Sequence, residues 1–135
     1  MDGATMQALV ERHLRAEGLG DVDGAVAVYT DDIDHDVVGF PNSPSRGVDR
    51  ARDFYKYLTA NFRAEGEGVL HRYVTDDAMI LDQIMTGTVI GSMLGLPGNG
   101  RRISFRTLHV FEFRNGLISR ENVWLDSAAI IDQLS

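Results

Sequence analysis

Three ionisable side chains in the sequence, Asp126, His109 and His35, have the chemistry for proton transfer. Asp126 ends an apolar segment, and a carboxylate against an apolar wall has the raised pKa that acid–base work needs. The same residue precedes a helical segment, where it would serve equally well as an N-cap. His109 could instead be a core histidine. His35 stands between two aspartates that favour its protonated form, or it is a surface histidine.

The segment 101–126 is expected to position two of these candidates, because it reads as two strands joined at Asn115-Gly116. Asn-Gly between apolar alternations indicates a hairpin, since a type I′ turn requires positive φ at both central residues. Counting outward from this turn places His109 opposite Asn122. One face then carries the side chains expected in a small-molecule site, namely Phe105, Thr107, His109, Phe111, Asn122, Trp124 and Asp126.

The opposite face of the same predicted hairpin mixes apolar and charged residues, namely Arg106, Leu108, Val110, Glu112, Glu121, Val123 and Leu125. Its apolar members would form an exposed patch on a monomer. We therefore expect a homodimer that pairs through this face.

Other segments are expected to complete a ligand site for a small hydrophobic molecule. Val37 shares a strand face with His35, and Phe40 follows it in a proline-bearing loop. Phe54 lies on the apolar stripe of the helix predicted over 48–62. Gln83 lies on the long strand predicted over 78–90. These four residues join the hairpin residues as predicted ligand-binding positions.

The order of the predicted elements defines the fold class. Helical spacing or strand alternation predicts helices at 5–18, 21–29, 48–62 and 127–134, and strands at 31–39, 69–75, 78–90, 103–113 and 118–126. Consecutive strands with short turns make an antiparallel sheet, and helices grouped early in the chain cover one face. We predict an α+β fold: a cone-shaped, curved sheet, mixed at its edge, wrapped over three helices, with a short C-terminal helix.

Composition limits the possible partners. The 135 residues carry a net charge of −7 and no run of basic residues, so nucleic acid and anionic membranes are poor candidates. Cysteine is absent, which excludes disulfides and thiolate metal sites. The sequence shows neither a signal-peptide pattern nor an apolar run of the ~20 residues that a membrane span needs. We expect a single domain over residues 1–135, soluble and cytoplasmic.

Several motifs resemble those of the SnoaL-like polyketide cyclases. They are the Thr-Gly-Thr at 86–88, the Gly-Leu-Pro at 95–97, and the Asn-Gly hairpin that ends in Asp126 before the last helix. That family belongs to a superfamily with nuclear transport factor two, ketosteroid isomerase and limonene-epoxide hydrolase. The resemblance implies a cone-shaped α+β barrel, usually a homodimer, with a deep hydrophobic pocket. It also implies an acid–base role for Asp126 and a polar pocket position for His109.

The chain departs from two mechanisms of this superfamily. The steroid isomerases hold an oxyanion with a first-helix tyrosine, where this chain has His13, and they place the base where it has Phe40. The epoxide hydrolases use an Arg and Asp pair on a middle strand, where this chain has Asp82 and Gln83 without arginine. Both routes are therefore disfavoured.

The sequence thus predicts a cofactor-independent enzyme that transfers protons on a hydrophobic carbonyl compound and closes a ring or isomerises it. The alternatives are a non-catalytic binder of such a molecule, an atypical epoxide hydrolase, and a purely structural dimerisation domain. A metal triad of His35, His109 and Asp126 is disfavoured, because the sequence has no short-spaced ligand pair.

Overall fold

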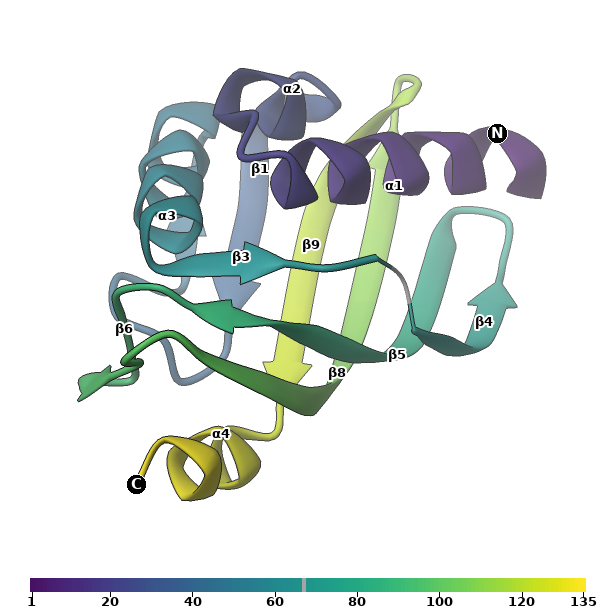
Figure 1. The fold of residues 1–135 in the computed structure, drawn as a ribbon. Helices are drawn as coiled ribbons and strands as arrows, with labels where there is room; N and C mark the ends of the chain where they lie inside the picture. Colours follow the sequence, from purple (N-terminus) through teal and green to yellow (C-terminus); the bar gives the residue numbers. More distant parts are fainter. Residues whose placement is uncertain (67) are drawn as a thin grey trace.

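The computed structural model describes residues 1–66 and 68–135. The elements run in the order α1 (Gly3–Gly18), α2 (Val22–Val26), β1 (Tyr29–Val37), β2 (Ser45–Arg46), α3 (Val48–Asn61), β3 (Phe62–Ala64), β4 (Val69–Val74), β5 (Ala78–Val89), β6 (Ser92–Met93), β7 (Leu96–Pro97), β8 (Arg101–Arg114), β9 (Leu117–Leu125) and α4 (Ser127–Leu134). Figure 1 shows their arrangement.

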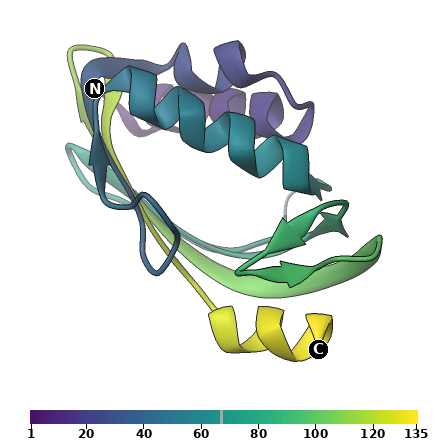
Figure 2. The same ribbon diagram turned by 90° about the vertical axis from the view of Figure 1, so that its left-hand side faces the viewer.

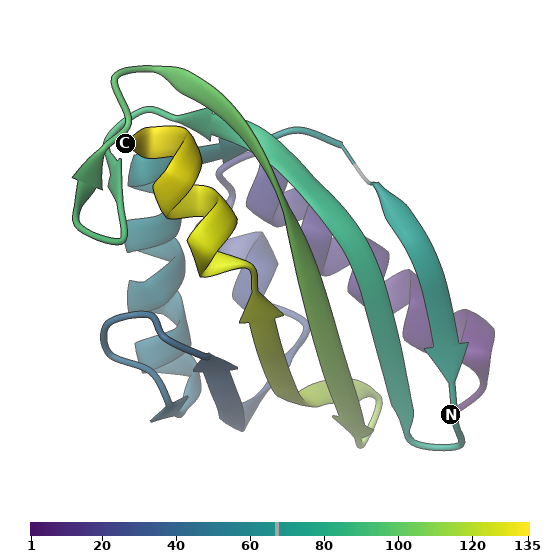
Figure 3. The same ribbon diagram turned by 90° about the horizontal axis from the view of Figure 1, so that it is seen from below.

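The long strands form one curled sheet, and α1, α2 and α3 cover its concave side (Figures 1 and 2). Figure 3 shows α4 on the side of the strands that faces away from these three helices. The predicted α+β architecture is therefore confirmed. No helix in the described ranges is long and apolar enough to cross a membrane.

The main sheet has the strand order β2-β1-β9-β8-β5-β3, and β4 also pairs with β5. The long neighbours β5, β8 and β9 are antiparallel, whereas β1 runs parallel to β9. The sheet is thus mixed near its β1 edge, as predicted. The segment 91–100, between the strands predicted at 78–90 and 103–113, contains a small separate hairpin of β6 and β7.

Local sequence explains the helix ends. Asp2 caps α1, because its carboxylate accepts a hydrogen bond of 2.8 Å from the amide of Thr5, so the helix begins earlier than the predicted residue 5. Asp21 caps α2 with a bond of 2.9 Å from the amide of Gly24. Gly47 precedes α3 with φ of 100°, a backbone angle that favours glycine.

The β8–β9 hairpin turns at Asn115-Gly116 as predicted, with φ of 54° and 77° at these two residues. The predicted register beyond the turn is wrong. Phe113 pairs with Ile118 but Glu112 pairs with Arg120, so Ser119 is an extra residue on β9. Such a bulge reverses the side-chain alternation of the strand that carries it.

The reversal changes which β9 residues face the helices. His109 lies opposite Val123, and Phe111 lies opposite Glu121. Glu121, Val123 and Leu125 therefore share the concave face with His109, contrary to the prediction. Asn122, Trp124 and Asp126 leave that face.

Candidate functional site

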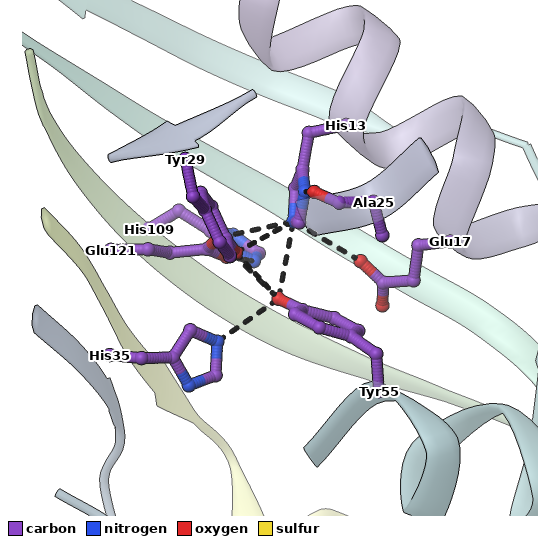
Figure 4. Close-up of polar contacts among 8 residues, drawn as sticks. All are labelled: His13, Glu17, Ala25, Tyr29, His35, Tyr55, His109 and Glu121. Atoms are coloured by element: carbon purple, nitrogen blue, oxygen red, sulfur yellow. Dashed lines mark hydrogen bonds and ion pairs between the residues drawn. The ribbon is translucent and has the colours of Figure 1, made fainter. Parts of the chain in front are cut away.

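A cluster of buried polar side chains lies between the sheet and the helices (Figure 4). Its centre is the carboxylate of Glu121 on β9. The hydroxyl of Tyr29 donates to its Oε1, and the Tyr55 hydroxyl lies 3.5 Å from the same atom. His13 Nε2 lies 3.1 Å from this Oε1. Tyr29 and Tyr55 are joined through their hydroxyls at 3.0 Å.

Each member of this cluster comes from a different element, and each occupies an inward position of it. His13 follows Met6 and Val10 on the buried stripe of α1. Tyr29 begins β1, and Tyr55 lies on the buried face of α3. Glu121 reaches the cluster because the bulge at Ser119 turns its side chain inward.

His13 and Glu121 form a buried ion pair. Nδ1 of His13 lies 2.7 Å from the carbonyl oxygen of Ala25, so both ring nitrogens face acceptors and the imidazolium satisfies both. Burial by itself would lower the pKa of His13, but the charge and hydrogen bond of Glu121 raise it to about 9. Burial would likewise raise the pKa of Glu121, but His13 holds it well below its usual range.

Two further histidines border the pair and are neutral. Burial lowers the pKa of His109 to about 4, in spite of the nearby Glu121 charge. Its Nε2 lies 3.8 Å from Oε2 of Glu121. Burial also lowers the pKa of His35, whose Nε2 lies 3.1 Å from the Tyr55 hydroxyl. His35 is therefore a buried neutral imidazole, neither protonated nor at the surface as the sequence suggested.

Glu17 stands at the edge of this cluster, one helical turn after His13. Its side chain is 9% exposed, and its Oε2 lies 3.8 Å from His13 Nε2. Burial raises the pKa of Glu17 to about 7, although the charge of His13 opposes the rise. A carboxyl group that titrates near neutral pH can both accept and return a proton, which is what general acid–base catalysis requires.

Glu17 lines a small cavity together with Tyr55, Thr107, His109 and Glu121. The remaining wall is apolar and includes Val37, Phe40, Phe54, Phe105, Val123 and Leu125. Its free space of about 40 Å³ has room for a few waters or a methyl-sized group. Thr107 Oγ1 and His109 Nδ1 are buried and have no hydrogen-bond partner within the described residues. A ligand in the cavity that reaches either atom would gain a hydrogen bond there.

The family assignment follows from a comparison of the sequence with family models. The model described as SnoaL-like polyketide cyclase matches residues 7–134. The chain belongs to this family. A comparison with curated proteins gave no match.

Solved structures agree with the fold of this SnoaL-like chain. A candidate polyketide cyclase from Xanthomonas campestris is 21% identical, with 98% of each chain covered and a TM-score of 0.86. TsrD from Streptomyces laurentii is 23% identical, with 100% of this chain and 98% of that chain covered and a TM-score of 0.82. An LEH-like epoxide hydrolase from M. tuberculosis is 22% identical, with coverage of 94% and 86% and a TM-score of 0.73.

The structure gathers only some of the predicted site residues of the SnoaL-like chain around the cavity. Val37, Phe40, Phe54, Phe105, Thr107 and His109 line it. His35 contacts its wall through Phe54, at 4.9 Å between ring centroids, and Phe111 stacks behind His109 at 5.5 Å. Gln83 is buried beside a neighbouring groove.

Three predicted residues of β9 and its end lie elsewhere. Trp124 is 45% exposed on the convex face. Asn122 is buried on that face and accepts a hydrogen bond of 2.6 Å from Arg120. Asp126 caps α4 by accepting a bond of 3.1 Å from the amide of Ala129, which favours the cap interpretation. Within the described residues no group of three or more His, Asp or Glu side chains could hold a metal ion.

The sequence did not identify four members of the cluster as site residues, namely Glu17, Glu121, Tyr29 and Tyr55. For Glu17 the sequence does contain a signal. Glu17 lies four residues after His13, which itself lies three after Val10, so both continue the helical stripe of α1 into the core. Two ionisable residues at core positions of one helix indicate either a buried ion pair or a functional site.

Proposed function

We propose that this SnoaL-like chain is a cofactor-independent enzyme of the cyclase or isomerase type, which transfers protons on a hydrophobic carbonyl compound. The observation that carries the proposal is Glu17, a carboxyl group with a pKa of about 7 that faces an apolar cavity. Thr107 and His109 line the same cavity, and each has a buried polar atom without a hydrogen-bond partner in the part of the chain that the structure describes, which supports the proposal.

The chemistry begins with Glu17 as the base. Its carboxylate takes a proton from the carbon next to the substrate carbonyl, and the electrons of that C–H bond form an enolate. The Thr107 hydroxyl and the neutral His109 imidazole can donate hydrogen bonds to the carbonyl oxygen as it gains negative charge. The neutral imidazole of His109 carries one N–H, and it donates to the substrate from Nδ1, the nitrogen without a partner within the described residues, in the tautomer that holds the proton there.

Product forms when the enolate carbon reacts. In a ring closure it bonds to a second carbonyl carbon of the same molecule, and the resulting alkoxide takes the proton back from Glu17. In an isomerisation the proton returns to a different carbon of the enolate. Either route begins and ends with Glu17 ionised, so no other reactant is consumed.

The His13–Glu121 ion pair has a positioning role in this proposal. The pair is overall neutral, and its positive member lies 3.8 Å from Glu17. His13 therefore limits the rise in the pKa of Glu17 that burial causes. Glu121 fixes His13 in turn, and Tyr29 and Tyr55 fix Glu121.

A hydrogen-exchange assay tests the proposal without knowledge of the natural substrate. The protein is incubated in D₂O with ethyl acetoacetate, and loss of the proton signal between the two carbonyls is followed by NMR. We expect exchange faster than in buffer with wild-type protein and a loss of about 100-fold or more in Glu17→Gln, because an amide is not a base. Asp126→Asn is the matched control and should exchange at the wild-type rate.

The second candidate function is a non-catalytic binder, which the missing catalytic sets of the superfamily favour, because His13, Phe40 and Gln83 occupy their positions. Under that function, Glu17→Gln and wild type would both leave exchange at the buffer rate while the ester still binds. The epoxide hydrolase alternative gains no support from β5, because Asp82 there pairs with Arg106 on the convex side at 2.7 Å and 2.8 Å.

A further inference from the structure

A groove far larger than the cavity lies beside it. Its free volume is about 550 Å³, within the range of small-molecule sites, whereas the cavity offers about 40 Å³. Leu14 and Arg15 of α1, Ala64 of β3 and Gln83 of β5 contribute to its walls. The volumes indicate that most of a bound molecule would lie in the groove.

Groove and cavity share a boundary. Glu17 on the helix side and Met85 on the strand side line both of them. Gln83 and Thr107 are directly paired across β5 and β8, and Gln83 lines the groove while Thr107 lines the cavity. A molecule that crosses this boundary would therefore pass between Glu17 and the Gln83–Thr107 pair. Met85 is unbranched and can adapt its shape to such a molecule.

The boundary contains an unused hydrogen-bond acceptor. Gln83 is 4% exposed, and its Oε1 has no hydrogen-bond partner within the described residues. A buried amide oxygen without a partner is costly, and a ligand donor that reaches it gains that interaction. Thr107 Oγ1, on the neighbouring strand, also has no partner among residues 1–66 and 68–135. Because Gln83 and Thr107 are paired across β5 and β8, both side chains lie on the sheet side of the boundary.

We propose that the substrate is an amphipathic carbonyl compound whose small reacting end enters the cavity, whose extended tail lies in the groove, and whose hydroxyl or N–H group donates to Oε1 of Gln83. The part about the reacting end rests on the proposed function; the part about the tail rests on the groove and on Gln83. Near Glu17, the small free space selects a methyl-sized group at the reacting end.

Two pairs of esters test this assignment. Each pair differs only by a terminal hydroxyl in place of a methyl group: 2-hydroxyethyl against propyl acetoacetate, and 4-hydroxybutyl against pentyl acetoacetate. Dissociation constants come from ¹H–¹⁵N NMR titrations, which also show where each ester binds. We expect at least one hydroxylated ester to bind about fivefold more tightly than its partner, the gain typical of one hydrogen bond.

The variant Gln83→Met keeps the size of the side chain and removes the acceptor, so the affinity ratio should fall to about one. Gln133→Met makes the same chemical change on α4, on the opposite side of the sheet from the groove, and should keep the wild-type ratio. Shifts in the wild-type titration should centre on Leu14, Gln83 and Met85. The assignment is overturned if the affinity ratio is one in both wild-type pairs or if it survives Gln83→Met. It is also overturned if the shifts lie on another surface, or if no ester binds at millimolar concentration.

Deuterium exchange measured on the same esters separates this inference from the proposed function. If Glu17→Gln abolishes exchange but neither hydroxylated ester is preferred, the tail assignment fails and the proposed function stands. If the preference depends on Gln83 but exchange does not depend on Glu17, the groove assignment stands and the enzyme assignment fails.

Discussion

Nε2 of His13 lies 3.1 Å from Oε1 of Glu121, and the two side chains are 0% and 2% exposed. The pair joins the first helix to the last strand, which are more than a hundred residues apart in the sequence. Water does not reach these buried groups, so each charge is stabilised by the opposite charge of its partner. The pair thus holds the helix that carries Glu17 against the sheet that carries His109.

Removal of one partner should be strongly destabilising. Glu121→Gln leaves the His13 site without its counter-charge, and we expect a loss of about 3–5 kcal/mol in the free energy of unfolding. Urea denaturation at pH 7 measures it. The double variant with His13→Gln should lose less than the sum of the two single variants. Additive losses would contradict the coupling.

Because the pKa of Glu17 is raised, the free energy of unfolding should depend on pH. The folded chain holds this proton up to about pH 7, while the unfolded chain releases it near 4.5. Stability from this group is therefore complete below pH 4.5 and is lost as the pH rises through 7, by on the order of 3 kcal/mol. Glu17→Gln removes this loss.

The stability gained in Glu17→Gln relative to wild type should therefore increase between pH 4.5 and 8. Denaturant melts at several pH values measure the difference. Glu112→Gln, an exposed position on β8, is the control for a surface change of the same kind. A difference between Glu17→Gln and wild type that stays constant across this pH range would contradict the raised pKa.

We propose that the chain dimerises through the convex face of the sheet, although with a different residue set from the one the sequence suggested. Trp124 and Leu108 are paired across β9 and β8 and are 45% and 38% exposed. Ile84 lies nearby on β5 and is 40% exposed. Together they leave an apolar patch on the monomer, which a second copy would cover.

The chain contains a single tryptophan, so its fluorescence reports this interface directly. Emission of Trp124 should shift to shorter wavelength as the protein is concentrated into the micromolar range, and sedimentation should show a dimer. Leu108→Glu should abolish both effects, because it places a charge at the centre of the patch. A monomeric mass at micromolar concentration in wild type would contradict the proposal.

Asp126 should behave as a helix cap. Asp126→Asn keeps a capping oxygen and should change the free energy of unfolding by only a few tenths of a kcal/mol, whereas Asp126→Ala should cost about 1 kcal/mol. Thermal or urea melts of both variants check this expectation. Equal losses in the two variants would mean that the bond to Ala129 does not stabilise α4.

Element types and the fold class could be predicted from the sequence because their signals are local. The Asn115-Gly116 turn and the stripe of α3 each lie within a few residues of sequence. The bulge at Ser119 has no comparable signal, since nothing in Ser119-Arg120 distinguishes an inserted residue from a regular one. One extra residue then moved Glu121 inward and Trp124 outward.

The candidate site was harder to predict because its members come from separate elements. Tyr29 and Tyr55 fit the apolar stripes of their segments and gave no sign of a shared carboxylate partner. Their contact with Glu121 depends on the packing of α3 and β1 against β9. The pKa of Glu17 depends in turn on burial by the assembled fold, which the spacing of charges along the chain does not determine.

The most direct test of Glu17 as the proton-transferring group is the pH–rate profile of deuterium exchange into ethyl acetoacetate. The base form of Glu17 accumulates as the pH rises, so kcat/KM for wild type should increase to a plateau with a midpoint near pH 7. In Glu17→Gln the enzyme-dependent rate and its midpoint should both disappear. A wild-type profile that is flat from pH 5 to 9, or one that Glu17→Gln retains, would contradict the account.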